Sequence, residues 1–439
     1  MRKTLLSMVA LLASGNAAMA QNGLTEIPDP DGSQLMCTVL SPNGKYIGGV
    51  CYGVNEGFIY DTQTRKMVKY EATDGDPDTD IQLKAIADNG VAVGWNGPAA
   101  IFDFAKEKCT TYGEVDQYLF AGISPNGRVI VGARYDGTDD EGTPCLFNEG
   151  VPTDLPQPSD KFLGAESAGA SALSVSNDSI ITGYWVDAMA TRPALLWTPN
   201  RDGKTFSAYP FSRGYFAPTN ESTMPYGMFS CDQTIMSANG KYVVLNVERL
   251  FDDESSEFGV ARFNTENDSI EYFMASDLEG VVDASGSEMY GFAVSDDGTI
   301  VGCYGGLYTG RTGFIWKKGE KLKSLVEAFP TVGKFAEYDA GGMNSPCGIS
   351  ADGRYIAGFA FVDDESADED SEEAGGMMSW FFDTQYETTG VASAQASEGA
   401  GKLVARFSAD GKRLNAGSKV RGFNMLLMKN GKTMKTFNK

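Results

Sequence analysis

The chain has no histidine among its 439 residues. This absence excludes the Ser-His-Asp and Cys-His arrangements that activate a nucleophile, and it removes the commonest metal ligand. Catalysis would therefore depend on carboxylates, tyrosine, lysine or a bound cofactor. The sequence also lacks a glycine-rich phosphate loop and a nucleophile elbow. We therefore favour a non-catalytic protein over an enzyme.

Cysteine is sparse and irregularly placed. The seven cysteines are an odd number, and no Cys-x-x-Cys pair occurs. This usage argues against a disulfide framework and against a zinc site. Most of the cysteines fall inside apolar, strand-like runs, so we predict buried thiols.

Long apolar runs are missing too. Residues 1–20, MRKTLLSMVALLASGNAAMA, join a basic start to a short apolar run and an Ala-Met-Ala cleavage site. A membrane anchor is the alternative, but Ser14, Gly15 and Asn16 interrupt a run already too short to span a bilayer. We predict a cleaved signal peptide and an exported protein without membrane insertion. The expected location is the cell surface or the extracellular space, with the periplasm as the alternative.

A net positive charge occurs only at the two ends of the chain. The net charge is −23, yet residues 402–439 carry ten basic residues against Asp410 alone. Without this tail and the basic leader, residues 21–401 carry a net charge of −34. Such a body does not bind nucleic acid or anionic lipid through electrostatics. Calcium or a cationic partner fits it better.

One short phrase recurs along the chain. It begins at seven places: SPNG at 41, ADNG at 87, SPNG at 124, SNDS at 176, SANG at 237, SDDG at 295 and SADG at 350. An Asn-Gly or Asp-Gly turn between β-branched runs is a strong hairpin signal, because both residues tolerate φ > 0. The fourth copy lacks its glycine. The spacing is close to the length of one propeller blade.

Each copy is part of a four-strand pattern. An apolar strand precedes the turn, and the next strand ends in a glycine: Gly48, Gly94, Gly132, Gly183, Gly302 or Gly358. A third strand contains aromatic residues, as in Gly313-Phe-Ile-Trp316, and a fourth follows a short polar turn. Four antiparallel strands repeated seven times predict an all-β, seven-bladed β-propeller over residues 21–385. A β-sandwich is the rival fold.

The repeated unit, followed by its Phe-x-Trp strand, resembles the HAF-type extracellular repeat of secreted bacterial β-propellers. The resemblance covers roughly residues 34–390, and this chain lacks the histidine that precedes the third-strand aromatic. It implies a propeller fold and export. The family has no single activity to transfer.

The loops differ between the two faces of the predicted propeller. If a blade's strands are named a to d from the axis outward, the a–b and c–d turns are short. All length variation falls in the b–c and d–a connections, which share one face, and these include 71–80, 134–143, 155–171, 209–230, 276–290, 325–346 and 361–377. Long loops on a rigid scaffold usually carry function, although tolerated insertion is the alternative. We predict a binding face there.

Aromatic residues supply the candidate ligand contacts. The loop that begins at Tyr209 is rich in rings among small polar residues, and Tyr-rich loops give rigid contact area. Further rings follow the second-strand glycines, where packing between blades is the alternative role. The predicted ligand-binding residues are Phe211, Tyr215, Phe216, Tyr226, Trp95, Tyr135 and Trp185.

Alternating carboxylates form a candidate metal site at Asp74, Asp76, Asp78 and Asp80. A curved loop aims several such oxygens at one Ca²⁺ ion. The EF-hand template fails because Ala85 stands where its glutamate belongs. A solvated acidic loop is the alternative.

The C-terminal residues form a separate segment. Residues 386–401 have a linker composition, and residues 402–439 predict a small β domain. An eighth blade is one interpretation, since SADG recurs at 408. The pattern also resembles the C-terminal sorting domain of type IX-secreted Bacteroidetes proteins, which implies the outer-membrane secretion machinery as a partner.

We therefore predict an exported, non-catalytic protein that binds a protein or glycan ligand through the loop-rich face. Calcium is the only cofactor considered. The first alternative is a carboxylate-dependent polysaccharide hydrolase or lyase, and the second is a cell-surface scaffold without a small ligand.

Overall fold

The computed structural model describes residues 23–72, 81–137, 142–156, 169–186, 194–202, 205–210, 234–250, 256–278, 288–305, 310–363 and 375–386, with four strands of the tail. The chain divides into two compact units, Met1–Gln385 and Tyr386–Lys439, which are described separately.

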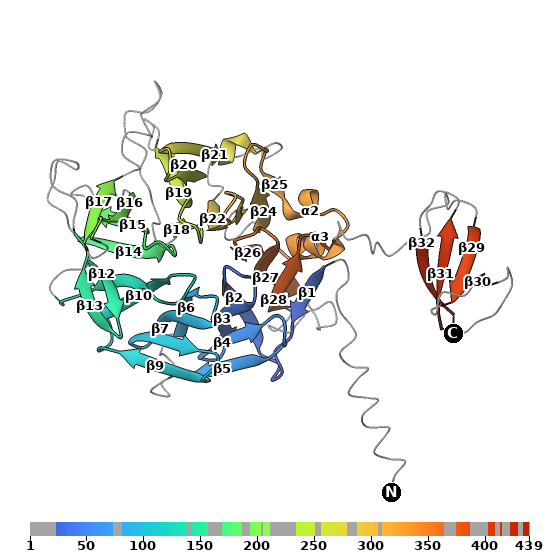
Figure 1. Cartoon of the computed structure of the whole chain (residues 1–439), viewed down its shortest axis with the longest axis horizontal. Helices are drawn as coiled ribbons and strands as arrows, with labels where there is room; N and C mark the ends of the chain where they lie inside the picture. Colours follow the sequence, from blue (N-terminus) through green and yellow to red (C-terminus); the bar gives the residue numbers. More distant parts are fainter. Residues whose placement is uncertain are drawn as a thin grey trace, which may run out of the picture. The chain divides into compact units, whose positions relative to one another are not determined.

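Seven four-stranded antiparallel sheets form the larger unit and surround a common centre (Figure 1). The seven-bladed propeller predicted from the repeat is confirmed. In blades 1 to 6 the strands pair in chain order from the centre outward. Blades 1 to 3 consist of β2 (Gln34–Leu40), β3 (Tyr46–Tyr52), β4 (Glu56–Asp61), β5 (Met67–Glu71); β6 (Ile81–Ile86), β7 (Val91–Asn96), β8 (Ala99–Asp103), β9 (Lys108–Tyr112); and β10 (Tyr118–Ile123), β11 (Ile130–Arg134), β12 (Thr143–Asn148), β13 (Val151–Asp154).

The remaining blades follow the same plan. Blades 4 to 6 consist of β14 (Gly169–Val175), β15 (Ile181–Val186), β16 (Ala194–Pro199), β17 (Phe206–Pro210); β18 (Ile235–Met236), β19 (Tyr242–Leu250), β20 (Ser256–Asn264), β21 (Ser269–Met274); and β22 (Met289–Val294), β23 (Ile300–Tyr304), β24 (Thr312–Trp316), β25 (Lys323–Ser324). Blade 7 contains β26 (Asn344–Ile349), β27 (Tyr355–Asp363) and β28 (Gly375–Asp383).

The ring is closed by the N-terminal strand. β1 (Leu24–Ile27) pairs antiparallel with β28 and is the outermost strand of blade 7. Its two apolar side chains enter different cores: Leu24 packs between blades 6 and 7, and Ile27 packs between blades 7 and 1. Blade 7 therefore combines both ends of the propeller sequence.

The apolar core consists of one cluster at each junction between adjacent blades. Between blades 1 and 2, for example, Ile59 and Tyr70 pack against Leu83 and Phe102. A single blade has no partner for these side chains, so stability depends on stacking around the ring.

The repeated phrase is the turn between strands a and b, as predicted, but only one of its residues has positive φ. Gly44 has φ +72°, and in the fourth copy Ser179 adopts φ +60°. Proline at the second position of two copies fixes a negative φ, which is incompatible with a turn that needs φ > 0 at both central residues. Within the turn, the Ser41 hydroxyl donates to Asn43 Oδ1 at 2.8 Å and accepts from the Tyr46 amide at 2.9 Å.

The glycine of strand b is required by a bulge in strand a. In blade 2 the bulge falls at Lys84, and Gly94 pairs with Leu83 beside it. A Cβ added to Gly94 would lie 1.9 Å from the Gln82 carbonyl oxygen. Six of the seven blades have this bulge. In blade 1 the glycine opposite the bulge is Gly49, not the predicted Gly48, since its added Cβ would lie 2.2 Å from the Met36 carbonyl oxygen.

The a–b turns are joined to one another around the ring. At the junctions from blade 1 to 2, 3 to 4 and 5 to 6, an Asx side chain of the second turn accepts a backbone amide of the first, as Asp88 Oδ1 does from Asn43 at 2.8 Å. The other four junctions use backbone pairs, among them Ala351 N to the Pro42 carbonyl at 2.6 Å. Hydrogen bonds therefore link all seven turns.

These hydrogen bonds between turns explain why the turn sequences alternate from one blade to the next. Turns 1, 3, 5 and 7 have Pro or Ala at the second position and Lys or Arg directly after the glycine, whereas turns 2, 4 and 6 have Asp or Asn at the second position. Because seven is odd, blades 7 and 1 are of the same kind and meet without an Asx link. Tyr355 of blade 7 packs on Gly44 of blade 1, as Tyr46 of blade 1 packs on Gly90 of blade 2.

Replacing Asp88 tests the turn network. Burial raises the pKa of Asp88, and the hydrogen bond from the Asn43 amide lowers it by less. Since the folded-state pKa exceeds the unfolded one, ionisation opposes folding at neutral pH, and this cost disappears as pH falls through the raised pKa. We expect Asp88→Asn to be as stable as the native protein or more so at pH 7, with the difference shrinking on acidification.

Asp88→Ala provides the contrasting variant. It loses the acceptor of the Asn43 amide, so it should be less stable than Asp88→Asn by about 1 kcal/mol of unfolding free energy at every pH. Thermal and urea unfolding between neutral and mildly acidic pH measure both variants. Turn 4 already has Asn177 at this position, where it accepts the Asn126 amide at 3.0 Å. A loss of stability in Asp88→Asn equal to that in Asp88→Ala would contradict the assignment.

A helical insertion covers the junction of blades 6 and 7. The connection after β25 contains α2 (Leu325–Ala328) and α3 (Gly333–Ala340), and η2 (Ala275–Asp277) follows β21. Phe335 of α3 is fully buried, and its ring centroid lies 5.3 Å from that of Trp380. The Tyr338 hydroxyl donates to Glu26 Oε1 of β1 at 3.0 Å. This connection, predicted as part of a binding face, thus holds the closing strand in place.

Two further findings concern the thiols and the helices. Four of the described cysteines are buried, as predicted, while Cys109 and Cys347 are half-buried. Among the described residues, no helix has the length and apolar character needed to cross a bilayer.

The C-terminal unit is a four-stranded sheet of β29 (Leu403–Ser408), β30 (Arg413–Leu414), β31 (Gly422–Met428) and β32 (Thr433–Asn438). The strand order is β30-β29-β31-β32, so β31 pairs with β29 and not with the strand before it. In every propeller blade, by contrast, the third strand pairs with the second. The sheet is therefore not an eighth copy of the blade, despite its SADG sequence.

Candidate functional site

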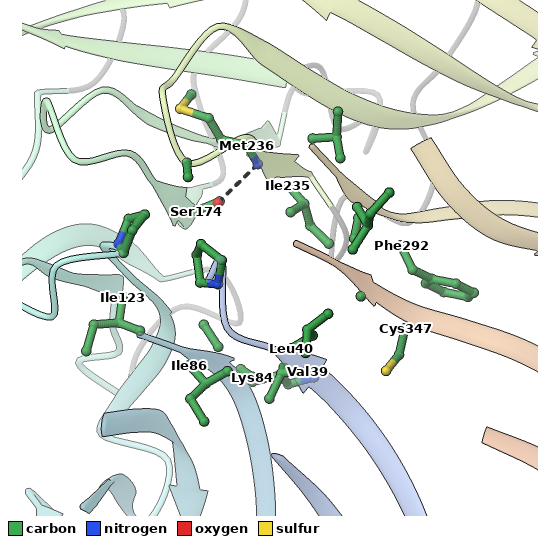
Figure 2. Close-up of a pocket in the computed structure, with 18 of the residues that line it drawn as sticks. Val39, Leu40, Lys84, Ile86, Ile123, Ser174, Ile235, Met236, Phe292 and Cys347 are labelled. Atoms are coloured by element: carbon green, nitrogen blue, oxygen red, sulfur yellow. Dashed lines mark hydrogen bonds between the residues drawn. The ribbon is translucent and has the colours of Figure 1, made fainter. Parts of the chain in front are cut away.

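The inner strands of all seven blades line a cavity of about 150 Å³ at the centre of the ring (Figure 2). Most of the residues that line it are apolar, because every strand a ends in an aliphatic or small residue before the turn, while polar atoms supply nearly half of the exposed lining. The lining includes Val39, Leu40, Ile86, Ile123, Val175, Met236, Phe292 and Ile349. The bulges of strand a also form part of the cavity wall. In each of the six blades with a bulge, the bulged residue lines the cavity; these residues are Thr38, Lys84, Ala121, Leu173, Phe292 and Cys347.

The cavity lies at the face of the short turns. Its lining comes from the last residues of each strand a and from the second turn residue of blades 1, 3, 5 and 7, which is Pro42, Pro125, Ala238 and Ala351. The two-blade period thus places proline and alanine at the cavity rim, while Asx side chains of the other turns bond to neighbouring turns. The long connections begin and end at the opposite face, so this cavity is not where the loop pattern predicts binding.

Lys84 is the one charged residue among those that line the cavity. It is exposed, and its ammonium lies 4.6 Å from the ring centroid of Trp95 on the neighbouring strand. The quadrupole of an indole ring attracts a cation over its face, so Trp95 holds the Lys84 side chain near the cavity. The predicted residue Trp95 is therefore half-buried beside the site and positions Lys84.

The polar hydroxyls of the cavity make internal hydrogen bonds. Ser174 Oγ accepts the Met236 amide at 3.1 Å (Figure 2). Thr38 Oγ1 donates to the Leu83 carbonyl at 2.8 Å. No aspartate or glutamate is among the residues described as lining the cavity. The arrangement offers apolar contact and one positive charge, and it offers no paired carboxylates for glycoside hydrolysis.

The other predicted ligand residues are dispersed. Tyr135 follows β11 and is half-buried, with its amide donating to the Gln117 carbonyl at 2.9 Å. Trp185 belongs to β15, where it pairs with Ala170. Phe211, Tyr215, Phe216 and Tyr226 lie outside the described residues. Tyr135 is not among the residues that line the cavity.

The candidate calcium ligands, Asp74, Asp76, Asp78 and Asp80, also lie outside the described residues. In the part of the chain that the structure describes, no cluster of three or more Cys, Asp or Glu side chains is arranged to hold a metal ion. The calcium site stays a prediction.

Sequence reasoning missed Lys84 and the cavity rim. Lysine replaces the uncharged residues found three positions before the turn in the other blades, which are Thr38, Ala121, Leu173, Thr234, Phe292 and Cys347. Alignment of the seven copies on this column would have singled it out.

Fold and site together define a seven-bladed β-propeller with an apolar central cavity, a scaffold that unrelated proteins use for binding and protein interaction. No protein-family profile matches the chain. Comparison with curated protein sequences gives no match either.

Several solved structures are similar over most of the chain. A streptogramin B lyase is 12% identical and has a TM-score of 0.41, over 82% of this chain and 96% of that one. The β-propeller domain of Cps50 (Swd1) from Myceliophteria thermophila is 11% identical with a TM-score of 0.44, over 82% and 99%. Hydrazine synthase of Kuenenia stuttgartiensis is 11% identical with a TM-score of 0.43, over 78% and 94%. At these values the similarities carry no inference about function.

Proposed function

We propose that this protein is a non-catalytic binding protein whose central cavity receives an apolar side chain of a protein partner. The observation that carries the proposal is the set of mainly apolar side chains that all seven blades contribute to the lining. A cavity of this size and composition accommodates a ring the size of benzene. A phenylalanine or leucine side chain on an exposed loop of the partner fits this description.

The lining favours a protein over a glycan. Sugar hydroxyls need hydrogen-bond partners, and the hydroxyls of Thr38 and Ser174 already have internal partners. The Lys84 ammonium adds a preference for a negative charge beside the apolar group. The expected epitope is therefore an apolar residue next to aspartate or glutamate. Binding through the opposite face, calcium binding, export and the type IX sorting tail stay predictions.

The test uses the full chain and acetylated peptides that carry Phe or Leu beside Asp or Glu, with binding measured by calorimetry. Ala121→Leu fills part of the cavity and should weaken binding at least tenfold. Lys84→Met should cost about threefold for acidic peptides, as expected for an exposed ion pair. It should not affect peptides in which Asn or Gln replaces the acid.

Lys108→Glu is the matched control, since Lys108 is an exposed lysine on the outermost strand of the blade that contains Lys84. It should leave binding unchanged. Peptide binding that is equally strong in the Ala121→Leu variant would refute the use of the cavity. A glycan array that gives ligands unaffected by Ala121→Leu would favour the opposite face instead.

A further inference from the structure

We propose that Cys37 and Cys347 are a modification site at the seam of the ring, where oxidation forms a disulfide that joins blade 1 to blade 7. The two sulfur atoms lie 3.3 Å apart, although the residues are 310 positions apart in the sequence. Both belong to innermost strands, Cys37 to β2 and Cys347 to β26.

The seam brings these two strands close together. A Cβ added to Gly348 would lie 2.4 Å from the Cβ of Leu40 and 3.1 Å from its amide nitrogen, so the glycine permits direct backbone approach. Ser379 of blade 7 fixes the register, because its hydroxyl accepts the Cys37 amide at 2.8 Å and donates to the Leu35 carbonyl at 2.9 Å. The two cysteine side chains therefore meet across a fixed interface.

The pairing is specific to the junction that closes the ring. Cys347 occupies the bulge position of its blade, and Cys37 the position just before the bulge in the next. At the equivalent junction between blades 1 and 2, Thr38 donates to the Leu83 carbonyl. At no other junction does the sequence place cysteine at either position.

Of the two cysteines, Cys347 is the one that borders the cavity, so a reagent approaches the pair from that side. Cys347 is half-buried and lines the central cavity, whereas Cys37 is fully buried behind it. A small disulfide entering the cavity is attacked by the Cys347 thiolate, which expels one thiolate of the reagent. The Cys37 thiolate then attacks the Cys347 sulfur of the mixed disulfide and expels the second. Two protein thiols are oxidised and one reagent disulfide is reduced to two thiols, which take up the two protons that the protein thiols release.

The effect of this bond is to prevent ring opening. The seam lacks the Asx turn link of junctions such as Asn43–Asp88, and it joins the first complete blade to the last. A cross-link over such a long loop restricts the unfolded chain strongly. Burial, reinforced by Cys37, raises the pKa of Cys347, so exchange is slow at neutral pH and the reaction is best followed at mildly alkaline pH.

The experiment treats the reduced full chain with bis(2-hydroxyethyl) disulfide and maps the cross-linked peptides by mass spectrometry. We expect a Cys37–Cys347 peptide and a melting temperature raised by roughly 5 °C or more, reversed by dithiothreitol. Cys37→Ala and Cys347→Ala should each abolish the shift. Cys303→Ala, which removes a buried blade-6 thiol that contacts Ser345, should retain it.

Two results would overturn the proposal. The first is Cys347 recovered only as a mixed disulfide with the reagent, with Cys37 still reduced. The second is an unchanged thermal shift in Cys347→Ala. Because mapping is done on the native sequence, poor folding of a variant does not remove the test.

Discussion

Gly132→Ala is expected to destabilise the propeller by roughly 3–5 kcal/mol or to prevent folding. A Cβ at this position would lie 1.7 Å from the Leu119 carbonyl oxygen, which is backbone of the adjacent strand. Side-chain rotation cannot relieve such a contact, so β10 and β11 must separate. Their separation breaks the innermost ladder of blade 3 and distorts the cavity wall at Ala121.

Gly333→Ala is the matched control. Gly333 begins α3, and a Cβ there would meet no atom within 4 Å. Alanine favours helix over glycine by up to about 1 kcal/mol, so this variant should be neutral or slightly stabilised. Calorimetric melting and urea midpoints compare the two substitutions. Equal stability of Gly132→Ala and Gly333→Ala would show that the bulge does not require glycine.

Blade 5 provides a natural comparison. Leu245 stands at the position of the bulge glycine, and it is fully buried. The innermost strand of this blade, β18, has only two residues, Ile235 and Met236, and its described ladder has no bulge.

Much of the propeller could be predicted because its signals are local. Each turn phrase specifies a hairpin from a few adjacent residues, and the apolar runs beside it specify strands. The closing strand could not be found in this way. Leu24–Ile27 precedes the first repeat, and its partner β28 lies at the far end of the propeller sequence. The four residues of β1 contain no sequence signal that identifies a partner strand so far along the chain.

The candidate site was predicted less well for a similar reason. Trp95 was chosen as a ring near a strand-b glycine, and the structure places it beside the cavity through Lys84. The cavity itself arises from strand ends of seven blades, none of which is distinctive alone. The prediction from loop length also overlooked that an insertion can have a structural role. The insertion with α2 and α3 buries Phe335 and Tyr338 against blade 7 and holds β1 in place.

Ile27→Asp is expected to open the ring. Ile27 is 1% exposed and packs with Leu35 and Phe58 in the core between blades 7 and 1. The substitution removes about 2 kcal/mol of apolar burial and places an unpaired carboxylate in that core, which costs several kcal/mol more. The sum is comparable to the whole stability of a typical domain, about 5–15 kcal/mol. We expect loss of the cooperative melting transition, or a large fall in its temperature.

Val54→Asp controls for the added charge, since Val54 is 45% exposed in a turn of blade 1 and should tolerate aspartate with little change. Hydrogen exchange distinguishes ring opening from general unfolding. Opening at the seam exposes β1, β2 and β28 first, because these strands meet there, while the cores between blades 3 and 4 stay protected. If Ile27→Asp melts like Val54→Asp, β1 does not hold the ring closed. If protection is instead lost uniformly, the closing strand stabilises all seven junctions together, and the seam is no weaker than the rest.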